Sequence, residues 1–499
     1  MKKILLFIYL FFCSYVHAQT NDTKRDNIWL FGYSDPIGAN GQIDSSYDNS
    51  IINFAVKPIK AKRQTMDMNF NDDIAIISDT TGKLLFYTNG IYIADATHQP
   101  MLNGKGLNPG KTADKNEKYG YILPQGSLIL PKPGNPDLYY LIHISTIFDV
   151  TNTPNDYKGE KLYYTLIDMS KNNGKGEVIE KNKVIIGNKF VDYGKITACR
   201  HANGKDWWII VADFDTKSYN ILSLSEKGIK LEKVQKFKTG NWGSVGQAVF
   251  SPDGTKYARF SGFDLLENNL LCLFDFDRCA GTLSNQKTLL TQKMTFAVAA
   301  AFSPNSQFLY IFDHLTGYQF DTKELKLKPD TVAIYDNFED TITGINTVFY
   351  QAQLAPDNKI YLSTIGSTKY LHVIHEPNKK GKACNVEQHG FNLAGINYTT
   401  MPNFPNFRLG KAAQPCTVGV EDEESDKNIK IYPNPVHDIL TIEATEILDN
   451  QTVSILDMLG KTVLSQKLSL GKNNINMSDF PNGTYILKVG NATRKLVKM

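Results

Sequence analysis

The sequence lacks long apolar runs and any marked excess of one charge. One unbroken apolar stretch, residues 4–12, is far shorter than the roughly 18 residues of a transmembrane helix, and no other stretch reaches that length. The 54 basic and 51 acidic residues leave a formal net charge of only +3. Such a balance gives no general attraction to nucleic acid, and no long basic run indicates a local patch. We therefore expect neither a transmembrane anchor nor a nucleic-acid partner.

Motifs of common catalytic and metal chemistry are also missing. The sequence contains no Gly-x-Ser-x-Gly elbow, phosphate loop, His-Glu-x-x-His pair or Gly-x-Gly-x-x-Gly fingerprint. Its histidines are dispersed, and His372 and His375 would face opposite sides of a strand. The acidic groups at residues 71–73, 213–215 and 275–277 are typical of turns and lack the full spacing of a calcium loop. We expect no catalytic residue, no metal site and no cofactor.

Sustained helical periodicity is absent too, whereas residues that favour strands are plentiful. Hydrophobic residues make up 42% of the chain and charged residues 21%, so a buried core can form. Aromatic residues reach 11%, mostly Tyr and Phe, and their rings favour pleated, half-buried strands. These features predict an all-β protein.

The N-terminal segment has the features of a signal peptide. Two lysines at residues 2–3 precede the apolar run at residues 4–12, and Val16-His17-Ala18 offers compact residues to a signal peptidase. We expect cleavage after Ala18, which makes Gln19 the mature N-terminus. The alternative is a lipoprotein with Cys13 as the lipidated residue, but the bulky Phe before that cysteine disfavours it.

Export places the remaining cysteines in an oxidising compartment, where some of them can pair. Their number is odd, so at least one stays free or pairs between chains, and none forms a Cys-x-x-Cys motif. We expect a disulfide between Cys384 and Cys416, because both lie near the end of the repeat array described next. The cysteines that follow the signal peptide are Cys199, Cys272, Cys279, Cys384 and Cys416.

A repeat with a period of 52 residues is the strongest internal pattern. Similar turn sequences with a Pro in register occupy residues 250–254, 302–306 and 354–358, and each precedes a strand-like run. The proline sets φ for the first turn position, and Asp, Asn or Gly tolerates the tight reversal. Further strand-like runs at residues 270–276 and 287–290 bring the first unit to about four strands in about 50 residues, as in a β-propeller blade.

Weaker copies upstream raise the count of inner hairpins to six. Their turns lie at residues 79–82, 131–134 and 201–204. Strand-like residues 29–33 and 397–407 have no hairpin partner, so we expect them to pair in a seventh blade that closes the ring and leaves no open edge. The sequence therefore predicts a seven-bladed β-propeller of the WD40/YVTN-like kind over residues 19–407. Several separate β-sandwiches are the alternative, which the shared period disfavours.

The composition changes after the propeller. Residues 408–428 predict a flexible acidic linker, since residues 421–426 hold five acids in six positions that repel one another. Seven short strand-like runs then follow within residues 429–499, which predicts a small β-sandwich of immunoglobulin-like type.

This last segment resembles the type A C-terminal sorting domain of the type IX secretion system. The resemblance implies passage through the periplasm and outer membrane, with the secretion translocon as partner. It also implies a sortase-like protease that removes the tag, and a protein that is secreted or held at the outer-membrane cell surface. The propeller segments at residues 29–32, 79–90, 163–169 and 274–279 resemble other type IX-tagged propellers, which share no common activity. The residues that carry the sorting motifs are Tyr432, Pro433, Asn434, Pro435, Gly460, Gly483 and Tyr485.

The only ligand-binding candidates are three glutamines, Gln125, Gln247 and Gln351, just before the turns of inner strands. They can face a ligand in the central channel, or they can satisfy neighbouring backbone groups. From the whole pattern we expect a secreted or surface-attached binding or adhesion protein, whose partner is a surface polysaccharide or another surface protein. The alternatives are an extracellular carbohydrate-active enzyme, either a glycoside hydrolase or a lyase, and a structural subunit of a surface or motility apparatus.

Overall fold

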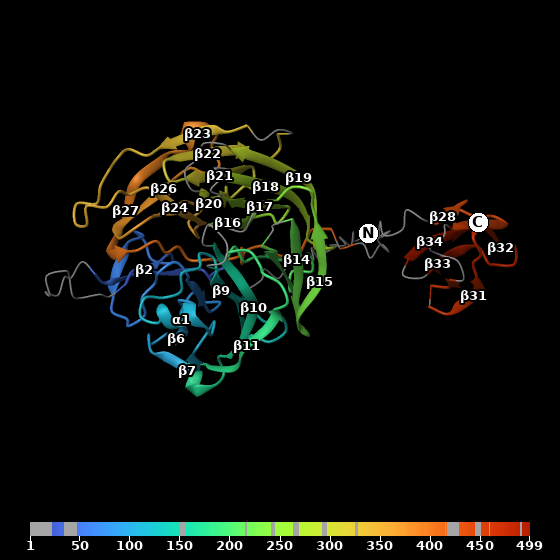
Figure 1. Ribbon diagram of the computed structural model, residues 1–499, viewed down its shortest axis with the longest axis horizontal. Helices are drawn as coiled ribbons and strands as arrows, with labels where there is room; N and C mark the ends of the chain where they lie inside the picture. The colour runs from blue at the N-terminus through green and yellow to red at the C-terminus, as the bar shows by residue number, and fades with distance from the viewer. Residues whose placement is uncertain are drawn as a thin grey trace, which may run out of the picture. The chain divides into compact units, whose positions relative to one another are not determined.

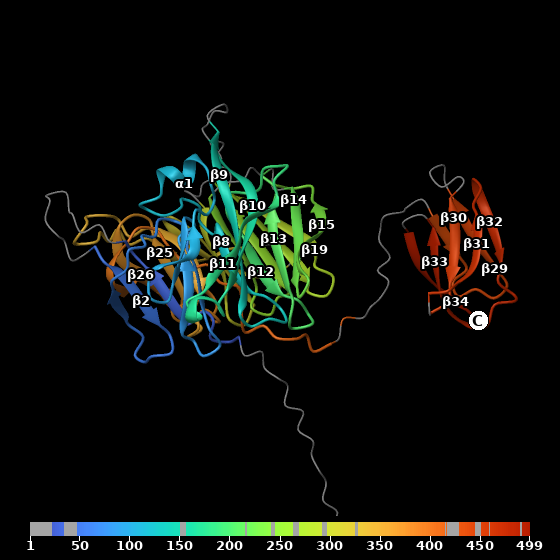
Figure 2. The ribbon, with the colours of Figure 1, turned by 90° about the horizontal axis from the view of Figure 1, so that it is seen from below.

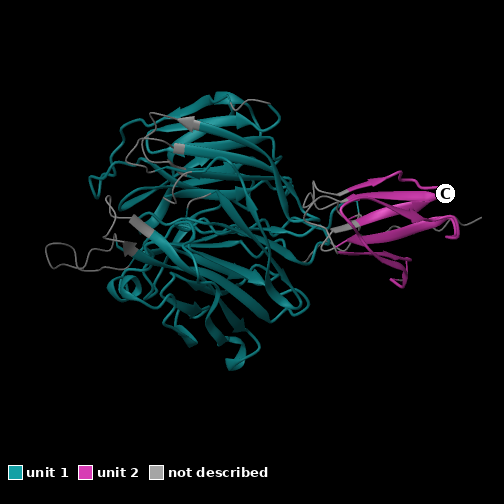
Figure 3. Ribbon diagram, turned by 45° about the vertical axis from the view of Figure 1, so that its right-hand side comes forward, with its two compact units in different colours: residues 1–415 teal, residues 416–499 magenta. Residues whose placement is uncertain are grey.

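The computed structural model describes residues 22–33, 47–149, 156–214, 217–240, 245–262, 269–291, 297–324, 328–414, 416, 429–444, 451–458, 460–489 and 492–499. The predicted signal peptide and its cleavage site at Ala18 and Gln19 lie outside these residues. The chain divides into two compact units, residues 1–415 and 416–499 (Figure 3). No helix among the described residues is long and apolar enough to cross a membrane.

Seven antiparallel blades follow one another around a common centre in chain order (Figure 1). The first blade has three strands and each of the others has four. First strands of successive blades lie against one another, as β16, β20 and β24 do, so these strands line the axis. The prediction of an all-β, seven-bladed propeller is confirmed.

The strands of the first four blades are bounded as follows. Blades 1 and 2 contain β1 (Ile28–Phe31), β2 (Asn49–Asn53) and β3 (Ala61–Gln64), then β4 (Ala75–Ser78), β5 (Leu84–Thr88), β6 (Tyr92–Asp95) and β7 (Pro100–Lys105). Blades 3 and 4 contain β8 (Ser127–Pro131), β9 (Leu138–Asp149), β10 (Asp156–Asp168) and β11 (Glu177–Ile186), then β12 (Thr197–Arg200), β13 (Trp207–Ala212), β14 (Ser218–Ser225) and β15 (Gly228–Lys236). A parallel bridge from Glu177 to Leu102 joins the outer strands of blades 2 and 3.

The last three blades contain the 52-residue repeat. Blade 5 contains β16 (Gly246–Phe250), β17 (Lys256–Ser261), β18 (Asn269–Asp277) and β19 (Thr282–Thr291). Blade 6 contains β20 (Ala297–Phe302), β21 (Phe308–Asp313), β22 (Thr316–Asp321) and β23 (Asp330–Ile334). Blade 7 contains β24 (Phe349–Leu354), β25 (Ile360–Thr364), β26 (Thr368–Ile374) and β27 (Val386–Asn397). The short helices are α1 (Lys111–Lys115), η1 (Asn172–Gly174) and η2 (Gly381–Cys384).

The repeat is visible in the backbone of its three hairpin turns. Gly254, Ser306 and Asn358, which are spaced 52 residues apart, adopt φ values of 73°, 62° and 66°. This left-handed region is the one that Gly and Asn enter most readily, so the turn sequence and the turn geometry agree.

The two ends of the ring meet, but not as a shared ladder of strands. β1 pairs with β2, with Ile28 opposite Asn53, so the predicted pairing of residues 29–33 with 397–407 is wrong. Pro402 and Pro405 lack the N–H groups that such a ladder needs. Side chains make the closure instead: the Trp29 and Phe404 rings stack with centroids 6.1 Å apart.

The segment after β27 passes beneath the inner hairpins, and we call residues 398–412 the strap. In Figure 2 it runs along the lower edge of the ring. The Asn403 amide donates to the carbonyl oxygens of Ser127 and Ile196, both at 3.0 Å. The Ala412 N–H donates to the Ala202 carbonyl at 2.9 Å. Residues 408–412, which we expected in the linker, therefore pack on the propeller.

The predicted disulfide between Cys384 and Cys416 is wrong. Cys384 is a free, buried thiol in blade 7, and the bond joins Cys416 to Cys279, between β18 and β19. The path of the strap explains the difference: the Arg278 guanidinium donates to the carbonyl oxygen of Gly410 at 2.5 Å. The chain thus approaches blade 5 rather than blade 7 as it reaches Cys416.

We expect a non-reducing peptide map of exported protein to link the peptides that contain Cys279 and Cys416. The Cys384 thiol should react with a maleimide only after unfolding, because its side chain is fully buried. Closing a loop of this length stabilises a fold by about 4–5 kcal/mol in the chain-entropy model, so reduction should lower the melting temperature. A map that links Cys384 to Cys416 would contradict the structure.

The second unit is a two-sheet β-sandwich. One sheet has the order β28-β29-β32 and the other has the order β31-β30-β33-β34. Their inner faces share a core that includes Val436, Leu440, Ile455, Leu487 and Leu496. The strands are β28 (Ile429–Tyr432), β29 (Ile439–Ala444), β30 (Thr452–Leu456), β31 (Thr462–Lys467), β32 (Gly471–Asn476), β33 (Gly483–Val489) and β34 (Ala492–Lys498).

Candidate functional site

Two of the three candidate glutamines bond to backbone groups across the propeller axis. The Gln247 carbonyl oxygen accepts from the N–H groups of Ala300 and Ala352, at 3.0 and 2.9 Å. Its amide nitrogen donates to the Ala352 carbonyl at 2.8 Å. Gln125 makes the equivalent pair of bonds with Ala248, at 2.9 and 3.2 Å. These amides therefore satisfy the inward edges of the inner strands.

Gln351 differs from its repeat partner Gln247. Its side chain is buried, and neither amide atom has a hydrogen-bond partner among the described residues. A break in the ladder between β24 and β25 falls between Phe349 and Ala352, which shifts Gln351 out of the register that Gln247 keeps. The sequence alone suggested equal roles for these two positions, and the structure separates them.

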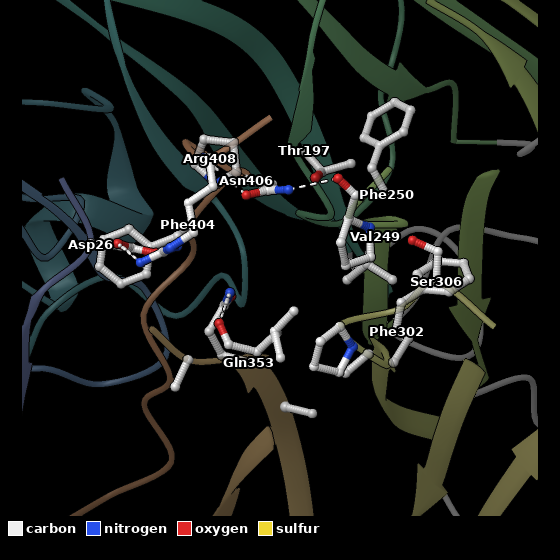
Figure 4. A pocket seen from close by; sticks show the side chains of 18 of the residues that line it. Asp26, Thr197, Val249, Phe250, Phe302, Ser306, Gln353, Phe404, Asn406 and Arg408 are labelled. Atoms are coloured by element: carbon white, nitrogen blue, oxygen red, sulfur yellow. Dashed lines mark hydrogen bonds and ion pairs between the residues drawn. The ribbon is translucent and has the colours of Figure 1, made fainter. Parts of the chain in front are cut away.

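A pocket of about 510 Å³ opens at the hairpin end of the axis (Figure 4). Gln125 and Asn403 lie at this pocket together with the small side chains of Ala248, Ala300 and Ala352. One wall repeats every 52 residues, with Phe250, Phe302 and Leu354 at equivalent positions. The volume is within the range of roughly 300–1,000 Å³ that is usual for small-ligand sites.

The opposite wall comes from the two ends of the ring. The Arg408 guanidinium binds the Asp26 carboxylate with both terminal nitrogens, at 2.6 and 2.8 Å. Burial raises the pKa of Asp26 above its ordinary value, and the bonds from Arg408 offset part of that shift. Asn406 fixes the neighbouring turn, because its amide donates to the Pro252 carbonyl at 2.7 Å. Closure of the ring therefore also builds this wall.

Three polar side chains at the pocket have atoms that could bond to a ligand, because these atoms have no hydrogen-bond partner among the described residues. The hydroxyl of Thr197, a residue only 5% exposed, bonds to no residue in the described part of the chain. The Gln353 amide nitrogen donates to the Leu354 carbonyl at 3.1 Å, while its side-chain oxygen accepts from no described residue. The Asn358 side chain is exposed and likewise has no partner there. Figure 4 shows Thr197 and Gln353 among the residues around the cavity.

A second polar cluster lies where β4 and β24 begin. Asp72 accepts a hydrogen bond from the Thr399 hydroxyl at 2.5 Å and another from the Tyr350 hydroxyl. Burial raises the pKa of Asp72 to about 6 and that of Asp73 to about 7. Asp73 is fully buried and accepts from the Ser127 hydroxyl at 2.5 Å, so a substrate has no access to it. The sequence of residues 71–73 indicates a turn and does not select either carboxyl as a site residue.

These carboxyls predict a fall in stability as the pH rises. The pKa of Asp73 is higher in the folded state than in the unfolded chain, so the folded state binds more protons between about pH 4 and pH 7. We expect the melting temperature to fall from pH 5 to pH 8, and Asp73→Asn to reduce that fall. The exposed Asp137→Asn serves as the control, with the pH dependence of the wild type. Equal slopes for all three proteins would contradict the assignment.

Two of the sorting-motif residues, Asn434 and Tyr485, make hydrogen bonds within the sandwich. The Asn434 amide donates to the Lys495 carbonyl at 2.8 Å, and its oxygen accepts from the Val497 N–H at 2.8 Å. The Tyr485 hydroxyl donates to the Pro481 carbonyl at 2.8 Å. Gly460 has a φ of 83° in the turn after β30. Tyr432 ends β28, Pro433 and Pro435 follow it, and Gly483 begins β33.

Metal-binding groups are not brought together in the described residues. There, no three side chains among His, Cys, Asp and Glu are placed to hold a metal ion. Buried histidines bond within the protein instead: His143 bonds to Asn108 and Thr165 at 2.7 and 2.9 Å, and burial lowers the pKa of both His143 and His372 to about 3.

Comparison with known proteins identifies the second unit. Residues 430–499 match the secretion system C-terminal sorting domain family. A comparison with curated proteins finds no match. Among solved structures, PorZ of Porphyromonas gingivalis, an essential bacterial surface component of the type-IX secretion system, shares 11% identity with a TM-score of 0.33. That match covers 90% of this chain, which spans only 63% of PorZ.

Two further solved structures are similar at the same level. A putative 6-phosphogluconolactonase from Bacteroides uniformis shares 12% identity with a TM-score of 0.36, over 90% of this chain and 99% of that one. Kuenenia stuttgartiensis hydrazine synthase shares 10% identity with a TM-score of 0.37, over 72% and 91%. Similarity of this degree carries no activity from one chain to another. The chain thus consists of a seven-bladed β-propeller and, in residues 430–499, a type IX sorting domain. This domain directs the protein through the periplasm to the cell surface or beyond.

Proposed function

We propose that this protein is an extracellular binding protein and that the pocket at the hairpin end of the axis is its ligand site. The sorting domain accounts for its export. The main support is the pocket itself. The Thr197 hydroxyl and the Gln353 side-chain oxygen line it, and neither atom bonds to another described residue. A hydroxyl and an amide oxygen that are open to a cavity can bond to a ligand that enters it.

The walls of the pocket suit binding without rearrangement. Its residues come from strand ends and hairpin turns of β16, β20 and β24 and from the strap, which Asn403 and Arg408 tie to the ring. Sites built on such fixed elements lose little entropy when a ligand binds. The partner that we propose is a component of the cell surface or its surroundings, a polysaccharide or another surface protein.

The enzymatic alternative rests on Asp72, whose raised pKa and bond from the Tyr350 hydroxyl are features of an acid–base group. A glycosidase needs a second carboxyl that reaches the substrate, and the neighbouring Asp73 is fully buried. We therefore favour binding over catalysis.

A panel of polysaccharides tests both alternatives with the full exported chain. Each polymer is scored for retained protein and for released soluble sugar. We expect retention without release, and we expect Val249→Trp, which fills the pocket, to abolish retention. The matched control is Val234→Trp on the exposed face of β15, which should bind like the wild type. Sugar release would favour the enzyme. Retention unaffected by Val249→Trp would remove the pocket from the proposal, and a failure of every polymer to bind would favour a protein partner or a structural subunit.

A further inference from the structure

Among the described residues that line the pocket at the hairpin end, no cation is free to bind an anion. The only cation in that set, Arg408, is held by both oxygens of Asp26. The exposed Asp253 carboxylate uses one oxygen in its own turn, where it accepts from the Ser251 hydroxyl at 2.6 Å and the Thr255 N–H at 3.0 Å, and its negative charge repels an anion. A phosphate, sulfate or uronate would find no unpaired cation among the lining residues, and its desolvation would go uncompensated.

The backbone edges at the pocket are closed to a peptide strand. Inner strands of a propeller present N–H and C=O groups toward the axis, and an extended peptide binds such an edge by adding a strand. Here the peptide groups of Ala248 and Ala352 are bonded to the glutamines, and so is the N–H of Ala300. The row of main-chain bonds that a peptide needs is therefore already used.

What the pocket offers is a mixture of neutral polar groups and apolar faces. Thr197, Gln353 and Asn358 present a hydroxyl and two amides that both donate and accept hydrogen bonds. Partly exposed Val249 and Leu354 present apolar surface beside them. The Phe250 ring itself points away from the cavity in Figure 4 and packs on the rings of Tyr257 and Phe276, at 5.2 and 4.8 Å between centroids. Saccharides combine hydroxyl groups at their edges with C–H faces, which is the complementary pattern.

We propose that this pocket binds a neutral saccharide unit, such as a hexose or N-acetylhexosamine residue of a larger glycan. This inference rests on the proposed binding function and adds the class of ligand. The Thr197 hydroxyl and the Gln353 oxygen bond to the sugar hydroxyls, and the apolar Val249 and Leu354 side chains pack against the C–H face.

The test measures binding of the full exported chain to immobilised neutral oligosaccharides, to sulfated and uronate oligosaccharides, and to a peptide library. We expect binding to neutral oligosaccharides alone. Thr197→Val and Gln353→Leu should each weaken it roughly three- to tenfold, the usual loss for one hydrogen bond. Because the Thr197 hydroxyl bonds to no described residue, Thr197→Val should leave the melting temperature unchanged, so that weaker binding reports a lost ligand contact. Exposed Thr331→Val and Gln99→Leu are matched controls that should bind like the wild type.

Three outcomes would overturn the inference in different ways. Binding of acidic oligosaccharides or peptides that Val249→Trp abolishes would refute the ligand class and leave the proposed binding function in place. Neutral oligosaccharides that bind Thr197→Val and Gln353→Leu as tightly as the wild type would refute the site. A chain that retains no probe of any class would refute the ligand class, and it would leave a folded surface protein as the partner in the proposed function.

Discussion

Removal of residues 429–499 is expected to leave a folded propeller in the periplasm, with none at the cell surface or in the medium. The deleted residues include the whole segment that matches the sorting domain, so the secretion machinery loses its signal. The propeller should still fold, because its hydrophobic clusters contain no residue of the deleted segment. The truncated chain also keeps Cys416 and with it the bond to Cys279.

Cell fractionation and protease shaving of intact cells measure this result. A chain that lacks only residues 421–426 is the matched control: it loses charge and length from the predicted linker, keeps the tag, and should reach the surface. Asn434→Ala should give a surface level between those of the two deletions, since it removes the two bonds that tie residues 433–435 to β34. Normal surface levels of the truncated chain would show that residues 429–499 are not the export signal.

The propeller was predictable from the sequence because its repeat has a local physical cause. Each inner hairpin needs a left-handed residue at the same turn position, and Gly254, Ser306 and Asn358 supply it at equal spacing. The sandwich of residues 429–499 was predictable for a similar reason, because short strands and turn residues alternate there. Local rules of this kind act on neighbouring residues, so a linear sequence contains them in full.

The closure and the disulfide were not predictable in the same way. Residues 397–407 look like a strand that lacks a partner, but Pro402 and Pro405 remove donors, and Asn403 bonds to the ends of other blades instead. The path of this strap decides that Cys416 meets Cys279. Proximity of Cys384 to the closing blade along the sequence contains no information about that path.

The candidate pocket likewise has one wall that was predictable from the sequence and one that was not. Its repeated wall, with Phe250, Phe302 and Leu354, is visible as the apolar residue that precedes each turn. Its polar wall joins Asp26 to Arg408 across 382 positions of sequence, and only the closed ring brings them together. The glutamines were selected because they precede the turns, yet the amides of Gln125 and Gln247 bond to the backbone and that of Gln351 is buried. Thr197, whose hydroxyl has no partner among the described residues, carried no signal in the sequence.

Asp192→Asn is expected to destabilise the propeller by about 3–5 kcal/mol, the usual cost of leaving a buried charge without its counter-ion. Asp192 is only 1% exposed and binds two buried cations. Its oxygens lie 3.0 Å from the Lys195 ammonium and 2.8 Å from the Arg259 guanidinium. The amide would keep the shape of the side chain and remove the charge that both cations share. Denaturant unfolding measures the loss, and exposed Asp137→Asn, as control, should change stability by less than about 0.5 kcal/mol.

The pH dependence of that loss isolates the part that comes from Lys195. Burial already lowers the pKa of Lys195 to about 8 in the wild type, although Asp192 opposes the shift. Without the carboxylate the pKa of folded Lys195 falls further, so the folded variant releases this proton at a lower pH than the unfolded chain does. Where the unfolded state binds more protons, stability rises with pH. The deficit of Asp192→Asn should therefore be larger at pH 6 than at pH 8. A deficit equal at both values would mean that Lys195 does not contribute to it, since the Arg259 guanidinium keeps its charge over this range.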